Sequence, residues 1–270
     1  MKHNHNKIGT IYKSLVISNA HSKFKNKSKF NYEYYYDMIY LVLNNINSWR
    51  SLEHTKCEAH YTTIFKVYKK WSNEHIFRDS YYQLLELFGY NINNLFKYNT
   101  DLFIDSMTVF NKSGSEHISK IPMYMKKKGT KIHIIGTKDK IPLIIFHSKP
   151  SVHDTRFIVK GLEEIISKFN ITNHINLIGD KLYIQDFNIK KSLKEIFNTK
   201  LITPKRKNQH NLKLTKTDKD KLKQRYTIEH INKIIAQFDR LHFRKDKPIT
   251  SYSEFCFMAC GIHFENNFIK

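Results

Sequence analysis

The chain has 270 residues, of which 40% are hydrophobic, so it can bury the core of one catalytic domain and a small accessory domain. Its three cysteines cannot make a complete disulfide framework, which favours a reducing compartment, and no apolar stretch is long enough for a signal peptide or a membrane span. The 46 Lys and Arg residues outnumber the 24 Asp and Glu residues and give a net charge of +22, which indicates a polyanionic partner such as nucleic acid, although an AT-rich genome would also enrich the chain in lysine.

The N-terminal third is predicted to be helical behind a basic arm. Residues 1–30 contain seven lysines, no acid and little periodicity, so we expect a flexible arm there. From residue 31 to residue 90, apolar residues recur at helical spacing in three segments. In one segment three lysines lie off the apolar stripe, namely Lys66, Lys69 and Lys70. This basic face predicts a helix-turn-helix-like DNA-binding domain, but a helical subdomain with a solvated lysine face fits the pattern equally well.

A polar, Asn-rich linker is expected over residues 91–100, and a second domain over residues 101–270. This domain opens with the apolar run 102–109, which is typical of a buried central strand. Asp105 lies inside the run, where a carboxylate is costly unless it is paired, hydrogen-bonded or bound to a metal ion. After a basic loop over residues 111–128, two short apolar runs predict a hairpin, 131–136 and 142–147.

The rest of the second domain alternates predicted helices with predicted strands. Strands are expected over residues 175–178 and 200–203. Helices are expected over residues 153–169, 184–197, 218–239 and 252–262, with a basic loop over 204–213. The order predicts an α/β domain in which helices flank a mixed five-stranded sheet.

Two further acids stand in positions that match Asp105. Asp180 follows the strand predicted over residues 175–178, and Glu229 lies in the helix predicted over residues 218–239. Mg²⁺ takes oxygen ligands, and two such ions about 4 Å apart can clamp the attacking and leaving oxygens of an in-line displacement. An acid on a strand, an acid at a second strand end and a helix glutamate would suit a two-metal site for phosphoryl transfer.

Several motifs stand in order between about Tyr35 and Phe264. They are Ile104-Asp105-Ser106, Gly129-Thr130-Lys131-Ile132-His133, Ile141-Pro142-Leu143, Val152-His153-Asp154, Gly179-Asp180-Lys181-Leu182-Tyr183, Pro204-Lys205-Arg206-Lys207-Asn208, Arg225 with Glu229, and Phe238-Asp239-Arg240-Leu241. Each motif alone is weak, but in this order they resemble the insertion-sequence transposases of the DDE type, most closely the insertion-sequence-five-like group. The resemblance implies a ribonuclease-H-like fold, with Asp105, Asp180 and Glu229 as a catalytic triad that binds two Mg²⁺ or Mn²⁺ ions.

Other charged and polar residues are candidates for supporting roles. Arg225 and Lys233 lie one helical turn before and after Glu229, where they could contact phosphate or orient the acid, or form ordinary surface ion pairs. Lys131, His133 and His153 are candidates near the acids, although each histidine could equally be a packed core side chain. Lys205, Arg206 and Lys207 could contact the DNA backbone, or their loop could simply be solvated. The sequence departs from the family pattern at Gly136, Leu182, Leu222 and Ala236.

The resemblance implies a DNA transposase that cuts at the ends of an insertion element and joins them to target DNA. Its expected partner is double-stranded DNA, on which a homodimer or higher oligomer could form, and no membrane is expected to take part. The alternatives are another ribonuclease-H-like nuclease, or a domesticated or decayed copy that only binds DNA. We expect the protein in the cytoplasm, with the nucleoid, of a bacterium, or in the nucleus or a viral factory in a eukaryotic or viral setting.

Overall fold

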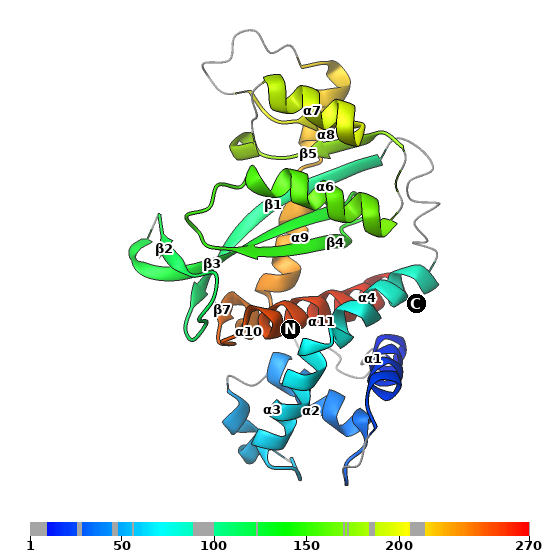
Figure 1. Ribbon diagram of the computed structural model, residues 1–270, viewed down its shortest axis with the longest axis vertical. Coiled ribbons are helices and arrows are strands. Elements are labelled where there is room, and N and C mark those ends of the chain that lie inside the picture. Colours follow the sequence, from blue (N-terminus) through cyan, green and yellow to red (C-terminus); the bar gives the residue numbers. More distant parts are fainter. Residues whose placement is uncertain are drawn as a thin grey trace. The chain divides into compact units, whose positions relative to one another are not determined.

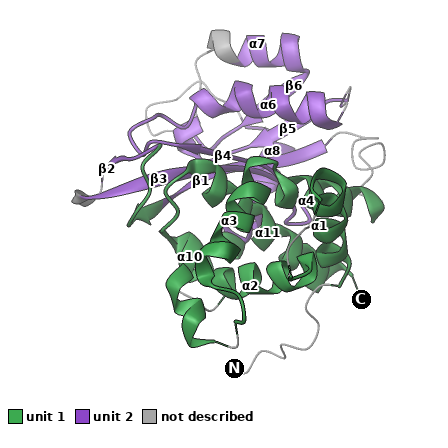
Figure 2. Cartoon of the chain, turned by 60° about the horizontal axis from the view of Figure 1, so that its bottom comes forward, with its two compact units in different colours: residues 1–88, 109–116, 234–270 green, residues 89–108, 117–233 purple. Residues whose placement is uncertain are grey.

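The computed structural model describes residues 10–25, 29–44, 48–55, 57–88, 100–122, 124–169, 171, 173–183, 187–205 and 214–269, with no side chains described for 124–126 and 187–189. These residues form two compact units (Figure 2). Unit 1 draws on residues 1–88, 109–116 and 234–270, and unit 2 on residues 89–108 and 117–233. The C-terminal helix thus groups with the N-terminal helices, whereas the sequence predicts that it belongs to the catalytic domain.

Unit 1 consists of helices and one short strand. Its elements are α1 (Thr10–Lys23), α2 (Tyr32–Asn44), η1 (Trp49–His54), α3 (Tyr61–Asn73), α4 (Ile76–Leu87), α10 (Asp239–His242), β7 (Phe243–Arg244) and α11 (Ile249–Phe268). Every residue of α11 from Glu254 to Ile262 is buried, including Cys256 and Cys260. A helix buried on all sides for more than two turns forms the centre of its unit. The segment 31–90 therefore shares its core with α11.

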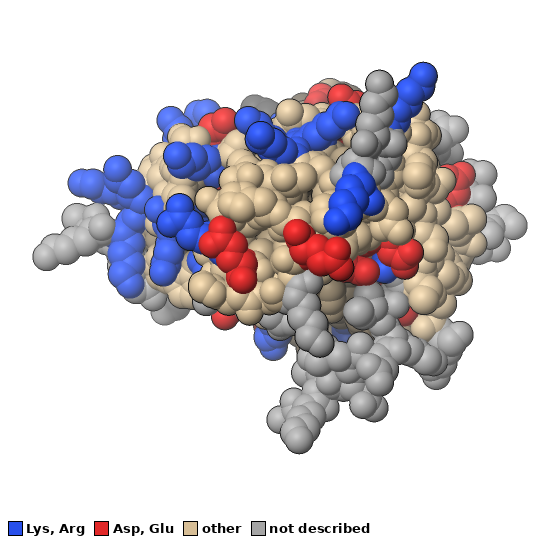
Figure 3. Space-filling view, turned by 90° about the horizontal axis from the view of Figure 1, so that it is seen from below, with Lys and Arg blue, Asp and Glu red and all other residues tan. Residues whose placement is uncertain are grey.

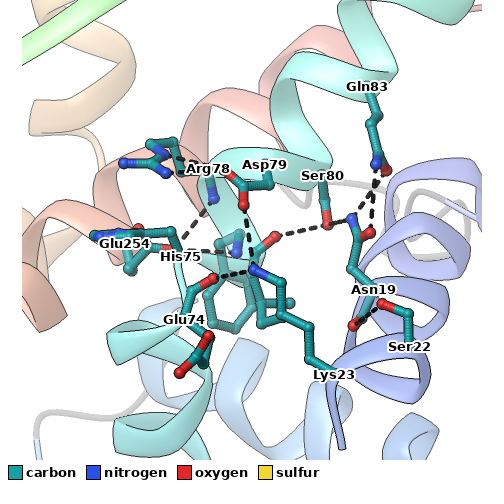
Figure 4. A network of polar contacts seen from close by, with 12 residues as sticks. Asn19, Ser22, Lys23, Glu74, His75, Arg78, Asp79, Ser80, Gln83 and Glu254 are labelled. Atoms are coloured by element: carbon teal, nitrogen blue, oxygen red, sulfur yellow. Dashed lines mark hydrogen bonds and ion pairs between the residues drawn. The ribbon is translucent and has the colours of Figure 1, made fainter.

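Two acids of α11 cap other helices of unit 1. Glu254 accepts hydrogen bonds from the backbone N–H groups of Phe77 and Arg78, 3.0 and 3.1 Å away, at the start of α4. Figure 4 shows this carboxylate beside His75, whose Nδ1 lies 3.0 Å from Glu254 Oε1. Glu265 caps α1 in the same way, accepting from the N–H groups of Ile11 and Tyr12. The first N–H groups of a helix have no partner within the helix, so these caps explain two buried acids.

Helix α1 corrects the prediction of a flexible arm over residues 1–30, since Thr10–Lys23 is an ordered helix of unit 1. Its buried residues Tyr12, Val16 and Ala20 recur every four residues and form a narrow stripe. The Tyr12 ring lies against Gly261 of α11, where an added Cβ would come within 2.5 Å of the ring. With only one buried residue in each turn, the stripe is a weak helix signal in the sequence. Residues 1–9 and 26–28 of the predicted arm lie outside the described residues.

Unit 2 is built on a mixed sheet with helices on it (Figure 1). Its strands are β1 (Thr100–Asn111), β2 (Ser119–Ile121), β3 (Tyr124–Thr137), β4 (Pro142–Ser148), β5 (Ile175–Ile178) and β6 (Thr199–Ile202). Strands β1, β5 and β6 are parallel, and β2 and β4 run antiparallel to different parts of β3. The strand order is β2-β3-β1-β5-β6, which confirms the predicted α/β class and mixed sheet.

The sheet has seven strands where the sequence predicts five. One added strand is β7, which pairs with Phe110 and Asn111 at the end of β1. The other is β2, which with the first half of β3 replaces the loop predicted over residues 111–128. Ile121 is the only buried residue of β2, and Lys127 and Lys128 are exposed, so this hairpin lacks the apolar pattern of a strand.

Among the described residues, four α-helices belong to unit 2 in whole or in large part, namely α6 (Arg156–Phe169), α7 (Phe187–Phe197), α8 (Lys216–Lys223) and α9 (Tyr226–Ala236). The prediction of one continuous helix over residues 218–239 is wrong, because the chain leaves the helical conformation at Gln224 and Arg225. A capping box of Thr215 and Asp218 begins α8. The residues at the interruption include no Gly or Pro, so the sequence carries no breaker signal there.

Two glycines let helices approach β3 closely. A Cβ at Gly161 of α6 would meet the end of the Ile135 side chain. A Cβ at Gly136 would meet Ile231 Cδ1 of α9 and would lie 2.9 Å from the backbone oxygen of Ile141. Gly136 stands where the resemblance leads one to expect an acid, and this packing leaves no room for one. In Figure 1 α6 lies in front of the sheet and α9 behind it.

We expect Gly136→Ala to lower the free energy of unfolding by about 1–3 kcal/mol, because the added methyl group meets a backbone oxygen that cannot move freely. Urea denaturation measures the change. Lys138→Ala, in the exposed turn two residues later, is the control and should stay within about 0.5 kcal/mol of the wild type. Equal stability of Gly136→Ala and wild type would contradict the close approach of α9 to β3.

Candidate active site

Asp105 and Asp180 lie at the same level of two neighbouring parallel strands. Strand β1 pairs with β5 in a constant register, in which Leu102 faces Leu177 and Phe103 faces Ile178. Asp105 stands two residues beyond Phe103, and Asp180 two residues beyond Ile178. Parallel strands that keep their register bring residues at equal offsets side by side. The pairing therefore brings these two predicted site residues together at the carboxyl end of β5.

The electrostatics of Asp105 agree with this geometry. Burial, helped by the charge of the nearby Asp180 carboxylate, raises the pKa of the Asp105 carboxyl from 3.8 to about 6, against hydrogen bonds and the Arg225 charge, which lower it. Two carboxylates in one partly buried site disfavour each other's ionisation. The pair thus carries unfavourable negative charge that a cation would relieve.

A tight turn after β5 fixes Asp180. Its Oδ1 accepts a hydrogen bond of 2.7 Å from the backbone N–H of Leu182, at the start of the short helix η2 (Lys181–Tyr183). A Cβ at Gly179 would lie 3.1 Å from both Ile104 Cγ2 and the Tyr183 ring. This contact is tighter than ordinary packing, so the residue before Asp180 is best a glycine. The Gly179-Asp180 motif is thereby explained in physical terms.

Glu229 lies on α9 and is exposed to solvent. On the same stripe of α9, Asn232 donates a hydrogen bond of 2.9 Å from Nδ2 to Asp105 Oδ2. Arg225, in the break before α9, acts on Asp105 through its charge. Glu229 thus lies in sequence between two residues that interact with Asp105. Among the described residues, however, no three His, Cys, Asp or Glu side chains gather closely enough to hold a metal ion.

The donor set around Asp105 nevertheless fits a hard divalent cation in part. Asp105 and Asp180 supply carboxylate oxygens, which Mg²⁺ and Mn²⁺ prefer. Asn232 Oδ1 is a buried oxygen that has no hydrogen-bond partner in the described part of the chain. These oxygens suit the divalent ion that the sequence predicts. Among the described residues, the structure shows no contact between Glu229 and this group of oxygens.

Lys131 and His133 form a buried cluster with Asp154. Lys131 Nζ lies 3.0 Å from Asp154 Oδ1 and donates a hydrogen bond of 2.8 Å to the Val152 carbonyl. His133 bonds Ser148 through Nε2, and burial lowers its pKa to about 4. His133 is therefore a packed side chain and is neutral at physiological pH, which agrees with the second of the two interpretations of this histidine, a core residue instead of a residue that supports the site.

Asp154 connects this cluster with the acids. The Tyr183 ring is buried, and its hydroxyl has no hydrogen-bond partner by geometry among the described residues. Burial raises the pKa of Tyr183, and the charges of Asp154, Asp105 and Asp180 raise it further. Tyr183 thus lies among three carboxylates. The only sign of this position in the sequence is that Tyr183 ends the Gly179-Asp180-Lys181-Leu182-Tyr183 motif.

The remaining candidates lie on the surface. His153 is exposed and contacts Thr155 Oγ1 at 2.8 Å in the turn before α6, so its contact is local. Lys233 and Lys205 are exposed, and Arg206 and Lys207 lie outside the described residues. On α3 the predicted lysine face is exposed opposite the buried residues Ile64, Tyr68 and Trp71, and it consists of Lys66, Lys69 and Lys70.

We expect Asp105→Asn to stabilise the metal-free protein at pH 8. The folded-state pKa of about 6 exceeds 3.8, so the stability that this carboxyl contributes is full below pH 3.8 and is lost as the pH rises through 6. The variant escapes this loss and should gain on the order of 2 kcal/mol at pH 8 but little at pH 4. Urea denaturation with a chelator measures both, with Asp139→Asn as the exposed control. A gain that does not depend on pH would contradict the electrostatic origin.

Comparison with known proteins shows a family and a fold. The family model described as "Transposase DDE domain" matches residues 96–262. The cryo-EM structure of a piggyBac transposase synaptic complex with hairpin DNA is similar with a TM-score of 0.52 and 10% identity, over 96% of this chain and 72% of that chain. At this identity the likeness shows the fold, so the predicted ribonuclease-H-like α/β fold is confirmed. No curated protein matches the sequence. Because the family match spans more than half of the chain, the protein belongs to the DDE transposase domain family.

Proposed function

We propose that this protein is a DNA transposase of the insertion-sequence-five-like group, which cuts at the ends of its element and joins them to target DNA. The observation that carries the proposal is the pairing of β1 with β5, which places Asp105 beside Asp180. Two adjacent acids, one within β1 and one just after β5, are suited to phosphodiester chemistry within a DDE transposase domain.

In this proposal Asp105 and Asp180 hold a divalent ion between them, and Glu229 reaches a second ion from α9. The bound ions would supply Lewis acidity at the phosphate and a more acidic water. Arg225, whose charge acts on Asp105, is suited to hold a phosphate oxygen of the scissile strand. Asp180 keeps its orientation through the Leu182 N–H, so that the carboxylates stay in place for cleavage and then for strand joining.

The exposed position of Glu229 favours one rival, a decayed copy that binds DNA without cutting. Leu222 and Ala236, which replace residues of the family pattern on the same helical region, point the same way. A ribonuclease-H-like nuclease that cuts but does not join is the other rival. Strand joining separates the transposase from both.

The proposed DNA partner rests on charge. The chain carries +22, and on the face that Figure 3 shows, Lys and Arg side chains gather toward one side while Asp and Glu lie in a band beside them. We propose that the α3 lysine face contacts the DNA backbone, and that the protein assembles on DNA as a homodimer or higher oligomer. The described helices include none that is both long enough and apolar enough to cross a membrane.

We expect Asp105→Asn, Asp180→Asn and Glu229→Gln each to abolish nicking and joining of labelled element-end DNA in Mg²⁺, because each removes one negative oxygen ligand but keeps the shape of the side chain. DNA binding in a gel-shift assay should survive. Asp139→Asn, an exposed acid in the turn between β3 and β4, is the control and should cut normally. An Asp180→Asn variant that cuts at the wild-type rate would overturn the proposed site.

We expect the triple variant Lys66→Ala, Lys69→Ala and Lys70→Ala to weaken duplex binding and to flatten its salt dependence. Each lost phosphate contact should lower the log–log slope by about 0.9. Fluorescence anisotropy between 50 and 200 mM salt, on the full chain, measures both effects. A matched triple variant in α8, of Lys216, Lys219 and Lys223, removes the same charge. If both triple variants change affinity and slope equally, the α3 face is not a specific DNA contact.

A further inference from the structure

Asn232 is the described side chain of α9 that touches Asp105 directly. Its Nδ2 donates to Asp105 Oδ2 at 2.9 Å, across 127 residues of sequence. It stands three residues after Glu229, on the same stripe of the helix. The contact shows that this part of the helix reaches the middle of β1, beside the carboxyl end of β5, where the two aspartates meet.

The carbonyl oxygen of the Asn232 amide, Oδ1, is buried and lacks a hydrogen-bond donor among the described residues. A buried carbonyl oxygen without a donor is unfavourable, and native proteins retain few of them unless water, an ion or a function satisfies them. Here that oxygen belongs to a side chain already bonded to Asp105, whose carboxylate lies near that of Asp180.

We propose that Asn232 is a metal-ligating residue, whose Oδ1 joins Asp105 and Asp180 as the third protein oxygen of one divalent-ion site. The inference rests on the proposed function, since it assigns a further ligand to the same site. An amide carbonyl is a normal ligand for Mg²⁺ and Mn²⁺, alongside carboxylate and water. In the absence of the ion, the Asn232 amide N–H donates to Asp105 and so keeps the carboxylate facing the helix.

This assignment gives the helix two separate tasks. Asn232 completes the coordination of the ion between the strand acids, and the exposed Glu229, one turn earlier, remains free to reach a second ion or the DNA. Arg225, in the break just before α9, is suited to contact phosphate. A residue that only hydrogen-bonds Asp105 would need its Nδ2, whereas a ligand needs its Oδ1, so substitutions can separate the two roles.

Mn²⁺ binding to the full chain without DNA, measured as free Mn²⁺ by electron paramagnetic resonance, tests the proposal. Asn232→Leu, which keeps the volume but removes the oxygen, should weaken Mn²⁺ binding about 10- to 100-fold. Asn232→Asp, which keeps an oxygen but loses the N–H donor, should bind Mn²⁺ at least as tightly as the wild type. His230→Asp adds the same charge at an exposed neighbouring position and should leave the affinity within about twofold. Circular dichroism checks that each variant is folded.

The outcomes separate the inference from the proposed function. If Asp105→Asn abolishes Mn²⁺ binding but Asn232→Leu binds as the wild type does, the strand acids hold the ion and Asn232 does not. If Asn232→Asp binds as weakly as Asn232→Leu, the side chain acts only through its N–H donor, and the ligand assignment is wrong. If His230→Asp tightens binding as much as Asn232→Asp, added charge alone explains the gain, which also overturns the assignment. A wild-type chain that binds no Mn²⁺ would overturn both the assignment and the metal site of the proposed function.

Discussion

The in-register pairing of β1 with β5 is the constraint on which the candidate site depends. Four residue pairs hold the two strands parallel with a constant offset, and that offset equals the separation of Asp105 from Asp180. Backbone hydrogen bonds thus force together two carboxylates that repel each other. The stability of the sheet outweighs the repulsion between the two carboxylates. A cation bound between them would remove that repulsion. A site that is unstable when empty is a common feature of metal-dependent active sites.

Close approaches of the backbone place the rest of the site around this pair. Because Gly179 has no side chain, the turn that carries Asp180 can lie against Ile104. Because Gly136 has none, α9 can pack closely against β3. Helix α9 and the break before it then bring Asn232 and Arg225 to Asp105. Unit 1 follows a different design, in which α11 forms the centre and its acids cap the ends of neighbouring helices. In both units, residues that are remote in sequence supply contacts that the local sequence cannot, such as the helix caps from α11 and the hydrogen bond from Asn232 to Asp105.

The parts that the sequence predicts well are those set by local pattern. The apolar strands β1, β4 and β5 and the helices α3 and α6 each repeat with the right period, so their place in the core was readable. Long-range packing decides what was missed: α1 is ordered by contacts with α11, and β2 by pairing with β3. The part of Asn232 could not be foreseen, because an asparagine on a helix stripe is ordinary until the fold brings Asp105 to it. The two strand acids were readable as a pair, since each ends or interrupts an apolar strand.

Anomalous diffraction from crystals grown with Mn²⁺ would locate the bound ion without any assay of activity. We expect an anomalous peak between the carboxylates of Asp105 and Asp180, within coordinating distance of both. Crystals that hold Mn²⁺ only at other positions, with the two carboxylates left without an ion, would contradict it. They would also remove the physical reason for placing the chemistry at the junction of β1 and β5.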